Sequence, residues 1–141
     1  MIATALDGIP VPPCAILLGW KLLAAKPEQG WIRVGFDGKR EFCNPAGFIQ
    51  GGILCAMLDD TMGPAAFIKT KGEVYVPTID MHVSFLAPAK VGPIIGEATV
   101  VQLGKTIAFL EGKLLDASGT VLARATASAR VVASAKALAN A

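Results

Sequence analysis

The chain has 141 residues, of which 53% are hydrophobic and 17% are charged, and its formal net charge is +2. A chain of this length is typical of one domain with its own core, and we expect a single domain over residues 1–141. The small net charge and the lack of a Lys/Arg cluster argue against a nucleic-acid-binding protein, and no stretch approaches the roughly 20 apolar residues of a membrane span.

The three cysteines, Cys14, Cys43 and Cys55, are too few and too widely spaced for a disulfide framework. With a single histidine, His82, we expect no metal site. The odd number of cysteines suits a reducing compartment. The N-terminus lacks both the basic residue and the unbroken apolar run of a signal peptide, so the sequence predicts a cytoplasmic protein.

The first half of the chain is predicted to contain two strands and one long helix. Residues 1–19 are expected to form an arm with a helical turn after Pro13, and residues 20–36 two strands joined by a turn at 28–30. A helix follows from about residue 50 to about residue 69. It is apolar on most sides, so the sheet must wrap around it. The apolar composition also favours a homo-oligomer, because obligate interfaces resemble a core cut in half.

After the helix the hydrophobic period changes from 3.6 to 2, which predicts strands. In the first strand one face carries Ile79, Met81, Val83 and Phe85, and the other carries Thr78, Asp80, His82 and Ser84. Three more strands begin near residues 93, 106 and 120, with short links that favour antiparallel pairing, and residues 132–141 are expected to form a flexible tail. One helix against one antiparallel sheet is an α+β design.

The predicted helix carries Gly51-Gly52 at its start and Asp59-Asp60 two turns later. The N–H groups at a helix N-terminus have no intrahelical partner and lie at the positive end of the dipole, so they can stabilise an oxyanion. Asp59 lies on nearly the same stripe as Gly52, about 10 Å along the axis, and can serve as nucleophile or general base. Both groups can act on one bond only if two subunits contribute them. A tight turn and a solvated helix edge are the structural alternative.

The spacing of Asn44, Gly47, Gln50-Gly51-Gly52 and Asp59 resembles that of the hotdog-fold acyl-CoA thioesterases, in their PaaI-like (phenylacetate-pathway) branch. The segments TIDMHVSFLAPAKVG and LGKTIAF also resemble this branch, and the resemblance extends over about residues 20–132. It implies a hotdog fold, in which a long helix is wrapped by a curved antiparallel sheet of five to six strands. It further implies dimers joined edge to edge, often paired into tetramers, with active sites at the dimer interface.

The resemblance implies hydrolysis of a small or medium acyl-CoA, aromatic ones included, to the free acid and coenzyme A. The Gly51 N–H would polarise the thioester carbonyl, and Asp59 of the other subunit would attack it or activate water. Thr78 would position that water, and Asn44 would orient the acid or the carbonyl. No metal or other cofactor is implied. The expected substrate and coenzyme A contacts are Gly52, Asp80, Phe85, Lys90, Gly104, Lys105 and Thr106, the two lysines being the candidate phosphate partners.

One position departs from the family pattern, because Gln50 stands where the family usually has a histidine. Glutamine can donate a hydrogen bond, but it cannot titrate. This leaves a second hypothesis, a non-catalytic acyl-CoA-binding protein with the same fold. A hotdog dehydratase or hydratase is a third, although His82 does not lie in the motif that such enzymes need. Asp60 lies about 100° around the helix from Asp59, off the glycine stripe, and Asp59 is the favoured acid.

Overall fold

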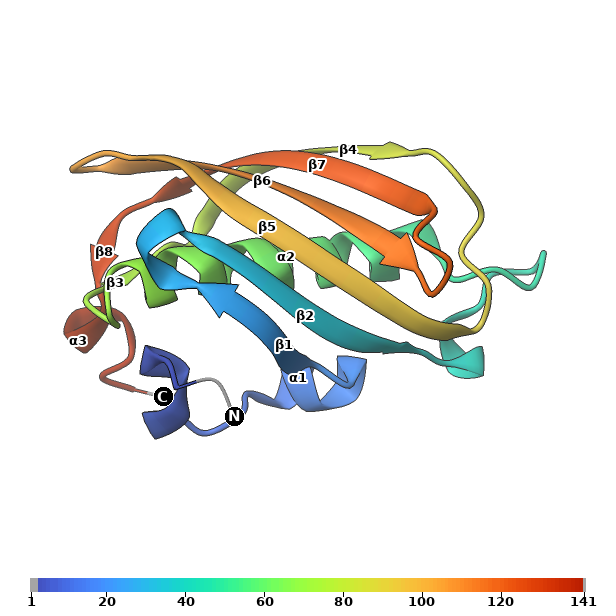
Figure 1. Ribbon diagram of the computed structural model, residues 1–141, viewed down its shortest axis with the longest axis horizontal. Helices are drawn as coiled ribbons and strands as arrows, with labels where there is room; N and C mark the ends of the chain where they lie inside the picture. The colour runs from blue at the N-terminus through green and yellow to red at the C-terminus, as the bar shows by residue number, and fades with distance from the viewer. Residues whose placement is uncertain (1–2, 141) are drawn as a thin grey trace.

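The computed structural model describes residues 3–140, in which one long helix packs against a six-stranded antiparallel sheet. The helix, α2, spans Gly51–Lys69, and Figure 1 shows the strands running over one side of it. The strand order is β1-β2-β5-β6-β7-β4. The strands are β1 (Lys21–Lys26), β2 (Trp31–Gly38), β4 (Thr78–Phe85), β5 (Gly92–Leu103), β6 (Ile107–Asp116) and β7 (Val121–Arg130). The predicted α+β architecture is therefore confirmed.

Short elements complete both ends of the chain. The N-terminal arm contains a 3₁₀ turn, η1 (Ala5–Gly8), and the helix α1 (Pro13–Leu18), and further 3₁₀ turns are η2 (Pro27–Gln29) and η3 (Arg40–Phe42). Residues 132–141 were expected to form a flexible tail, but β8 (Val132–Ala133) pairs with β3 (Val74–Tyr75) and leads into α3 (Ser134–Ala137). The Ser134 N–H donates to the Glu73 carbonyl at 2.9 Å, which fixes this segment. Residues 1, 2 and 141 of the predicted arm and tail lie outside the described residues.

The core lies between α2 and the inner face of the sheet. At two glycines the helix rests directly on the sheet backbone. A Cβ atom on Gly96 of β5 would lie 2.4 Å from Thr61 Oγ1, and one on Gly112 of β6 would lie 3.0 Å from Met62 Cγ. Because these strand positions carry no side chain, the helix approaches closely enough for a helix residue such as Leu58 to be fully buried.

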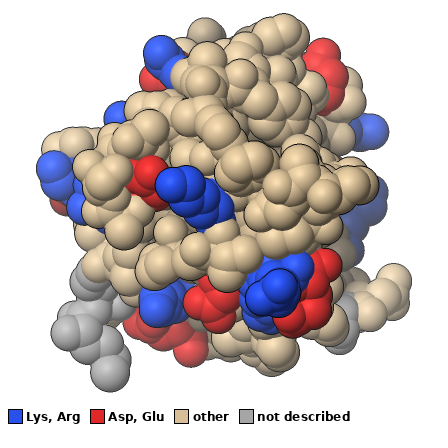
Figure 2. Space-filling view, turned by 90° about the vertical axis from the view of Figure 1, so that its right-hand side faces the viewer, with Lys and Arg blue, Asp and Glu red and all other residues tan. Residues whose placement is uncertain are grey.

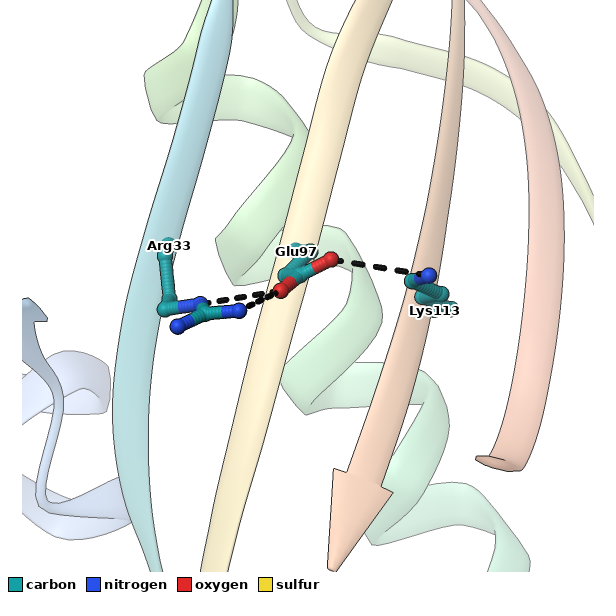
Figure 3. Close-up of polar contacts among 3 residues, drawn as sticks. All are labelled: Arg33, Glu97 and Lys113. Atoms are coloured by element: carbon teal, nitrogen blue, oxygen red, sulfur yellow. Dashed lines mark hydrogen bonds and ion pairs between the residues drawn. The ribbon is translucent and has the colours of Figure 1, made fainter. Parts of the chain in front are cut away.

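The outer face of the sheet carries an ion-pair network across three strands (Figure 3). Glu97 of β5 accepts from Arg33 Nε of β2 at 2.9 Å, and its second oxygen lies 3.6 Å from Lys113 Nζ of β6. Arg33, Glu97 and Lys113 are direct cross-strand neighbours, so opposite charges face each other at this register. Exposed pairs of this kind contribute about 0.2–1 kcal/mol each, so the network supports the register rather than determining it.

Candidate active site

The start of α2 presents two unpaired backbone donors. Gln50 is the N-cap residue, and its side-chain Oε1 accepts from the Ile53 N–H at 3.2 Å. Within residues 3–140, the N–H groups of Gly51 and Gly52 donate to no acceptor. A Cβ atom on Gly52 would lie 2.6 Å from Gln50 Oε1, so glycine is what allows Gln50 to fold over the first turn. Gln50 thus has a capping function that requires no titration, and the two N–H groups remain free at the positive end of the helix.

Asn44 organises the loop that leads into α2. Its side-chain Oδ1 accepts from the N–H groups of Ala46 (3.0 Å) and Phe48 (3.2 Å), which is the pattern of an Asx turn. Gly47 has φ +85°, a left-handed conformation that favours glycine, and its N–H donates to the Asn44 carbonyl at 3.0 Å. The two residues of the family pattern that precede the helix therefore shape this loop. The expected role of Asn44 toward the acid or the carbonyl stays a prediction.

A cavity of about 370 Å³ lies beside the Gly51 end of the helix. Phe85, at the end of β4, packs its ring against Gly51, because a Cβ atom on that glycine would lie 3.2 Å from Phe85 Cζ. A largely apolar pocket with a few backbone donors at its edge is the usual form of a small-molecule site. Its walls include Asn44, Phe48, Gly51, Leu54, Phe85 and Leu86.

Asp59, the predicted acid, and Thr78, the predicted hydroxyl, contact each other. Thr78 Oγ1 donates to Asp59 Oδ1 at 2.6 Å, a charge-assisted hydrogen bond. The sequence alternation placed Thr78 on the same strand face as Asp80 and His82, and this is wrong. A β-bulge between Thr78 and Asp80 adds one residue to β4, which turns Thr78 to the side of α2 and leaves Asp80 on the outer face.

Asp60, the neighbour of Asp59, occupies a different environment. Asp59 is exposed, whereas Asp60 is half-buried, and its Oδ2 is buried without a hydrogen-bond partner in the described part of the chain. Burial, and secondarily the charge of Asp59, raises the pKa of Asp60 to about 6. The Trp20 indole N–H donates to the Asp60 carbonyl at 2.9 Å, so this side of the helix is covered by the segment that leads into β1. The burial of Asp60 favours Asp59 as the accessible acid. No pattern in the sequence indicated this burial.

The remaining residues considered from the sequence lie away from both Asp59 and the Gly51 cavity or are ill-suited to catalysis. Lys90 is exposed in the β4–β5 connection, and Gly104, Lys105 and Thr106 are exposed in the β5–β6 hairpin. His82 lines an open hollow of about 600 Å³ on the outer face of the sheet. Cys43 is half-buried, and burial raises the pKa of the half-buried Cys55 thiol, which disfavours the reactive thiolate.

Within one chain the predicted residues form two separate groups. The start of α2, the end of β4 and the β4–β5 connection lie at the end of the molecule drawn on the right of Figure 1, and the β5–β6 hairpin lies at the opposite end. The first group holds Gly51, Phe85 and Lys90. Thr78 belongs to the hairpin end. The Arg130 N–H donates to the Pro77 carbonyl, and the N–H of Val131, the next residue, donates to the Thr106 carbonyl. Thr78 and Phe85 stand at opposite ends of β4, about 24 Å apart at roughly 3.4 Å per residue.

The surface at the Gly51 end carries no region of a single charge. Figure 2 looks at this end and shows Lys and Arg side chains beside Asp and Glu side chains in small groups, with uncharged surface between them. Such a mixed surface does not provide the basic stripe that a nucleic acid requires, in agreement with the small net charge.

Comparison with known proteins identifies the family. A family model described as the thioesterase superfamily matches residues 46–123, from the loop before α2 into β7. Acyl-coenzyme A thioesterase 13 of Homo sapiens is 31% identical over 106 residues, which cover 74% of this chain and 75% of that protein. The chain belongs to the thioesterase superfamily.

Solved structures place this thioesterase among the hotdog folds of the PaaI-like branch. A phenylacetic acid degradation-related protein of Ralstonia eutropha JMP134 superposes with a TM-score of 0.83 and 31% identity, covering 89% of this chain and 95% of that one. The E. coli PaaI protein, from the phenylacetic acid degradation operon, shares the fold with a TM-score of 0.74 at 17% identity, covering 86% and 85% of the two chains. The predicted fold and family are confirmed, and the protein is a thioester hydrolase. No helix within residues 3–140 is both long and apolar enough to cross a membrane.

Proposed function

We propose that this thioesterase hydrolyses acyl-CoA thioesters to the free acid and coenzyme A, at a site shared between two copies of the chain. The observation that carries the proposal is the division of the candidate residues. The pair Asp59–Thr78 and the donor Gly51 are separated within one chain, yet the reaction needs a carboxylate and an oxyanion donor at one carbonyl. The name of the human relative, an acyl-coenzyme A thioesterase, supports the choice of substrate.

The edge strand β4 supplies a way to join the two groups. It pairs with β7 on one side, and its other side has no partner strand among residues 3–140. Antiparallel pairing with a second β4, with the two-fold axis at His82, would set Thr78 opposite Phe85 of the second copy, because the bulge at Ile79 takes up one residue. Because Phe85 packs on Gly51, Asp59 would then face Gly51 of that copy. Ile79, Phe85 and Leu86 are 57%, 55% and 57% exposed along this edge, which supports a covered interface.

The proposed chemistry uses an oxyanion donor and one carboxylate. The carbonyl oxygen of the thioester accepts from the Gly51 N–H, where the helix dipole stabilises the developing negative charge. Asp59 of the other copy attacks the carbonyl carbon, or takes a proton from the water that attacks it. Thr78 holds Asp59 Oδ1, which leaves Oδ2 for this step. The C–S bond breaks, and coenzyme A leaves as the thiolate, which takes up a proton. If Asp59 has attacked, water then hydrolyses the acyl–Asp59 anhydride, which releases the acid and restores the carboxylate. No redox or metal step is required.

Coenzyme A is expected to bind across both copies. Lys90 precedes β5 and Lys105 follows it, so within one chain they lie at opposite ends of the sheet. The two lysines at one site would therefore come from different copies. Each would act as a point charge toward phosphate groups. The apolar cavity beside Gly51, with Phe48 and Phe85 in its walls, supports a small, medium or aromatic acyl group. A cytoplasmic location stays a prediction.

Complementation between two inactive variants tests the shared site. Asp59→Asn removes the acid, and Gly51→Pro removes the donor N–H at the first helical position, which tolerates proline. Gln50 has ψ 140°, as a residue before proline requires. Co-expressed as a purified heterodimer, the two variants rebuild one intact site, so we expect about half of the wild-type thiol release from phenylacetyl-CoA or hexanoyl-CoA. An inactive heterodimer, with melting temperature and mass unchanged, would mean that each site lies within one chain.

A further inference from the structure

The bulge in β4 decides which way Thr78 points. Opposite β4, Ala129 pairs with Thr78 and Ser128 pairs with Asp80, so two steps on β4 match one step on β7. Beyond the bulge the alternation is regular, with Met81 and Val83 packed against the core. A strand without the extra residue would direct Thr78 to the outer face together with Asp80, because side chains alternate with a period of two. The hydrogen bond from Thr78 to Asp59 therefore depends on the bulge.

Hydrophobic packing does not hold this bulge in place. Ile79, the residue inside it, is 57% exposed, and β4 is an edge strand with a single partner. Two polar contacts secure it instead. On one side the Arg130 N–H donates to the Pro77 carbonyl at 2.9 Å. On the other side the Asp80 carboxylate accepts twice from Ser128, from its hydroxyl at 2.6 Å and from its N–H at 3.3 Å.

We propose that Ser128 is a positioning residue of this thioesterase, which, together with Asp80, latches the β4 bulge so that Thr78 is aimed at Asp59. A bulge interrupts the backbone ladder, and the Asp80 carboxylate occupies the interruption by accepting from the facing residue. Both bonds of the latch lie on the outer face of the sheet, whereas Thr78 and Asp59 meet on the inner face. The latch acts on the Asp59 carboxylate indirectly, through the β4 backbone between Asp80 and Thr78. The inference rests on the proposed role of Asp59 in hydrolysis.

This assignment gives Asp80 a different role from the coenzyme A contact that the family resemblance implies. Its Oδ1 is engaged by Ser128 before any ligand binds. Removing the latch is expected to lower kcat and leave KM unchanged, because Thr78 and Asp59 lose their geometry while the coenzyme A contacts remain. A misplacement of about 1 Å at reacting groups can cost up to about 100-fold in rate.

Kinetics of Ser128→Ala test the latch. We expect kcat for phenylacetyl-CoA or hexanoyl-CoA to fall by about 10- to 100-fold with KM unchanged. Asp80→Ala should give the same loss, and the two losses should not add. Ser128→Thr keeps a hydroxyl and should restore most of the rate. Thr126→Ala, on the same outer face of β7 but without a hydrogen bond to Asp80, is the matched control and should match wild type.

The Thr78→Ala background separates positioning from general destabilisation. If Ser128 acts through Thr78, Ser128→Ala should lower kcat no further when Thr78 is already alanine. An equal loss in both backgrounds, or a rise in KM alone, would overturn the proposal.

A crystal structure of Ser128→Ala gives a readout that needs no activity. The latch predicts that the bulge shifts and that the bond from Thr78 Oγ1 to Asp59 Oδ1 is lost. A variant structure that keeps this 2.6 Å bond would overturn the latch even if the wild type is an active thioesterase. A wild type that hydrolyses no acyl-CoA would contradict the proposed function, and the variant structure would still decide whether the latch exists.

Discussion

Two adjacent carboxyl groups on α2 differ in what surrounds them. Asp59 is exposed and accepts a hydrogen bond from Thr78, whereas Asp60 is half-buried with one oxygen unpartnered in the described structure. Burial raises the pKa of Asp60 to about 6, so its carboxyl takes up a proton at a higher pH than an ordinary aspartate does. Adjacent acids in unlike environments can carry unlike roles.

Asp60→Asn should change how the stability depends on pH. The folded pKa, about 6, lies above the ordinary aspartate pKa of 3.8, so between these values the native state binds more protons than the unfolded state. The stabilising effect of protonated Asp60 is complete below the unfolded pKa and is lost as the pH rises through the folded pKa. Thermal denaturation should therefore show the variant melting above wild type at neutral pH, with the difference shrinking toward pH 4.

Asp116→Asn is the control of opposite sign. The hydrogen bond from the Ser118 side chain leads the contacts that lower the pKa of Asp116, so its carboxylate stabilises the fold above the unfolded pKa and loses this effect as the pH falls. This variant should melt below wild type at neutral pH and approach it in acid. A difference between Asp60→Asn and wild type that is the same at both ends of the pH range would contradict the burial of Asp60.

Gly51→Pro should lower kcat relative to Gly51→Ala. Both variants place a Cβ atom against Phe85, but only proline removes the N–H that we propose to bind the oxyanion. Loss of one oxyanion donor typically costs about 10²- to 10³-fold in kcat. Thiol-release assays on the two variants, with circular dichroism to verify folding, measure this difference. Equal rates for proline and alanine would exclude the Gly51 N–H as the donor.

At the level of elements, the first turn of α2 depends on one pair of residues. Gln50 caps the turn by folding over Gly52, and any side chain at residue 52 would displace it. The exchange of the family's usual histidine for glutamine therefore keeps a residue that closes the helix start. The cap orients the turn whose first residue, Gly51, lines the cavity, so local stability and the candidate oxyanion site are linked.

A double-mutant cycle on Gln50 and Gly52 measures this coupling. Gln50→Ala should cost about 0.5–1 kcal/mol through loss of the cap. Gly52→Ala should gain up to about 0.8 kcal/mol of helix propensity in the Gln50→Ala background, but little in wild type, where it displaces the cap. Chemical denaturation of the four proteins gives the interaction energy. Strict additivity would show that Gln50 does not cap the helix in solution.

The bulge in β4 shows what alternation alone cannot reveal. Thr78, Asp80 and His82 read as one face in the sequence, but one inserted residue sends Thr78 to the opposite side. The bulged residue, Ile79, is an ordinary strand residue, and Pro77 just before it is equally compatible with the start of a regular strand, so neither marks the insertion. The signal that could have indicated it is indirect, namely that an acid on the helix needs a hydroxyl on the helix side of the sheet.

For the whole molecule, the unpaired edge of β4 is the feature that calls for a second copy. The strand exposes apolar side chains at an open edge, a combination that monomers avoid. Thr78, which contacts Asp59, and Phe85, which packs on Gly51, stand at opposite ends of this strand. Antiparallel pairing of two copies would therefore cover the apolar surface and also complete the site.

Leu86→Asp should yield a monomer with little thioesterase activity. Leu86 is 57% exposed in the single chain, so the substitution should disturb the fold little while placing a charge in the proposed interface. Val101→Asp is the matched control, because Val101 is 60% exposed on β5, away from the β4 edge. Light scattering gives the mass of each variant, and thiol release its activity. A dimeric and active Leu86→Asp protein would rule out this edge as the interface.

The sequence by itself determined the elements and the family. The change of period at the end of α2, the short glycine-containing links and the apolar helix predicted the α+β fold, and the spacing from Asn44 to Asp59 indicated the thioesterases. These patterns are local, because the periodicity of a helix or a strand shows itself within a few residues of sequence.

Only the tertiary structure decided how the residues are used. The burial of Asp60, the cap by Gln50, the pairing of β8 with β3 and the turn of Thr78 toward Asp59 depend on contacts between distant parts of the chain. The separation of Gly51 from Thr78 also follows from how β4 lies along α2. A one-residue change of register reverses every side chain beyond it, and no local pattern reports such a change.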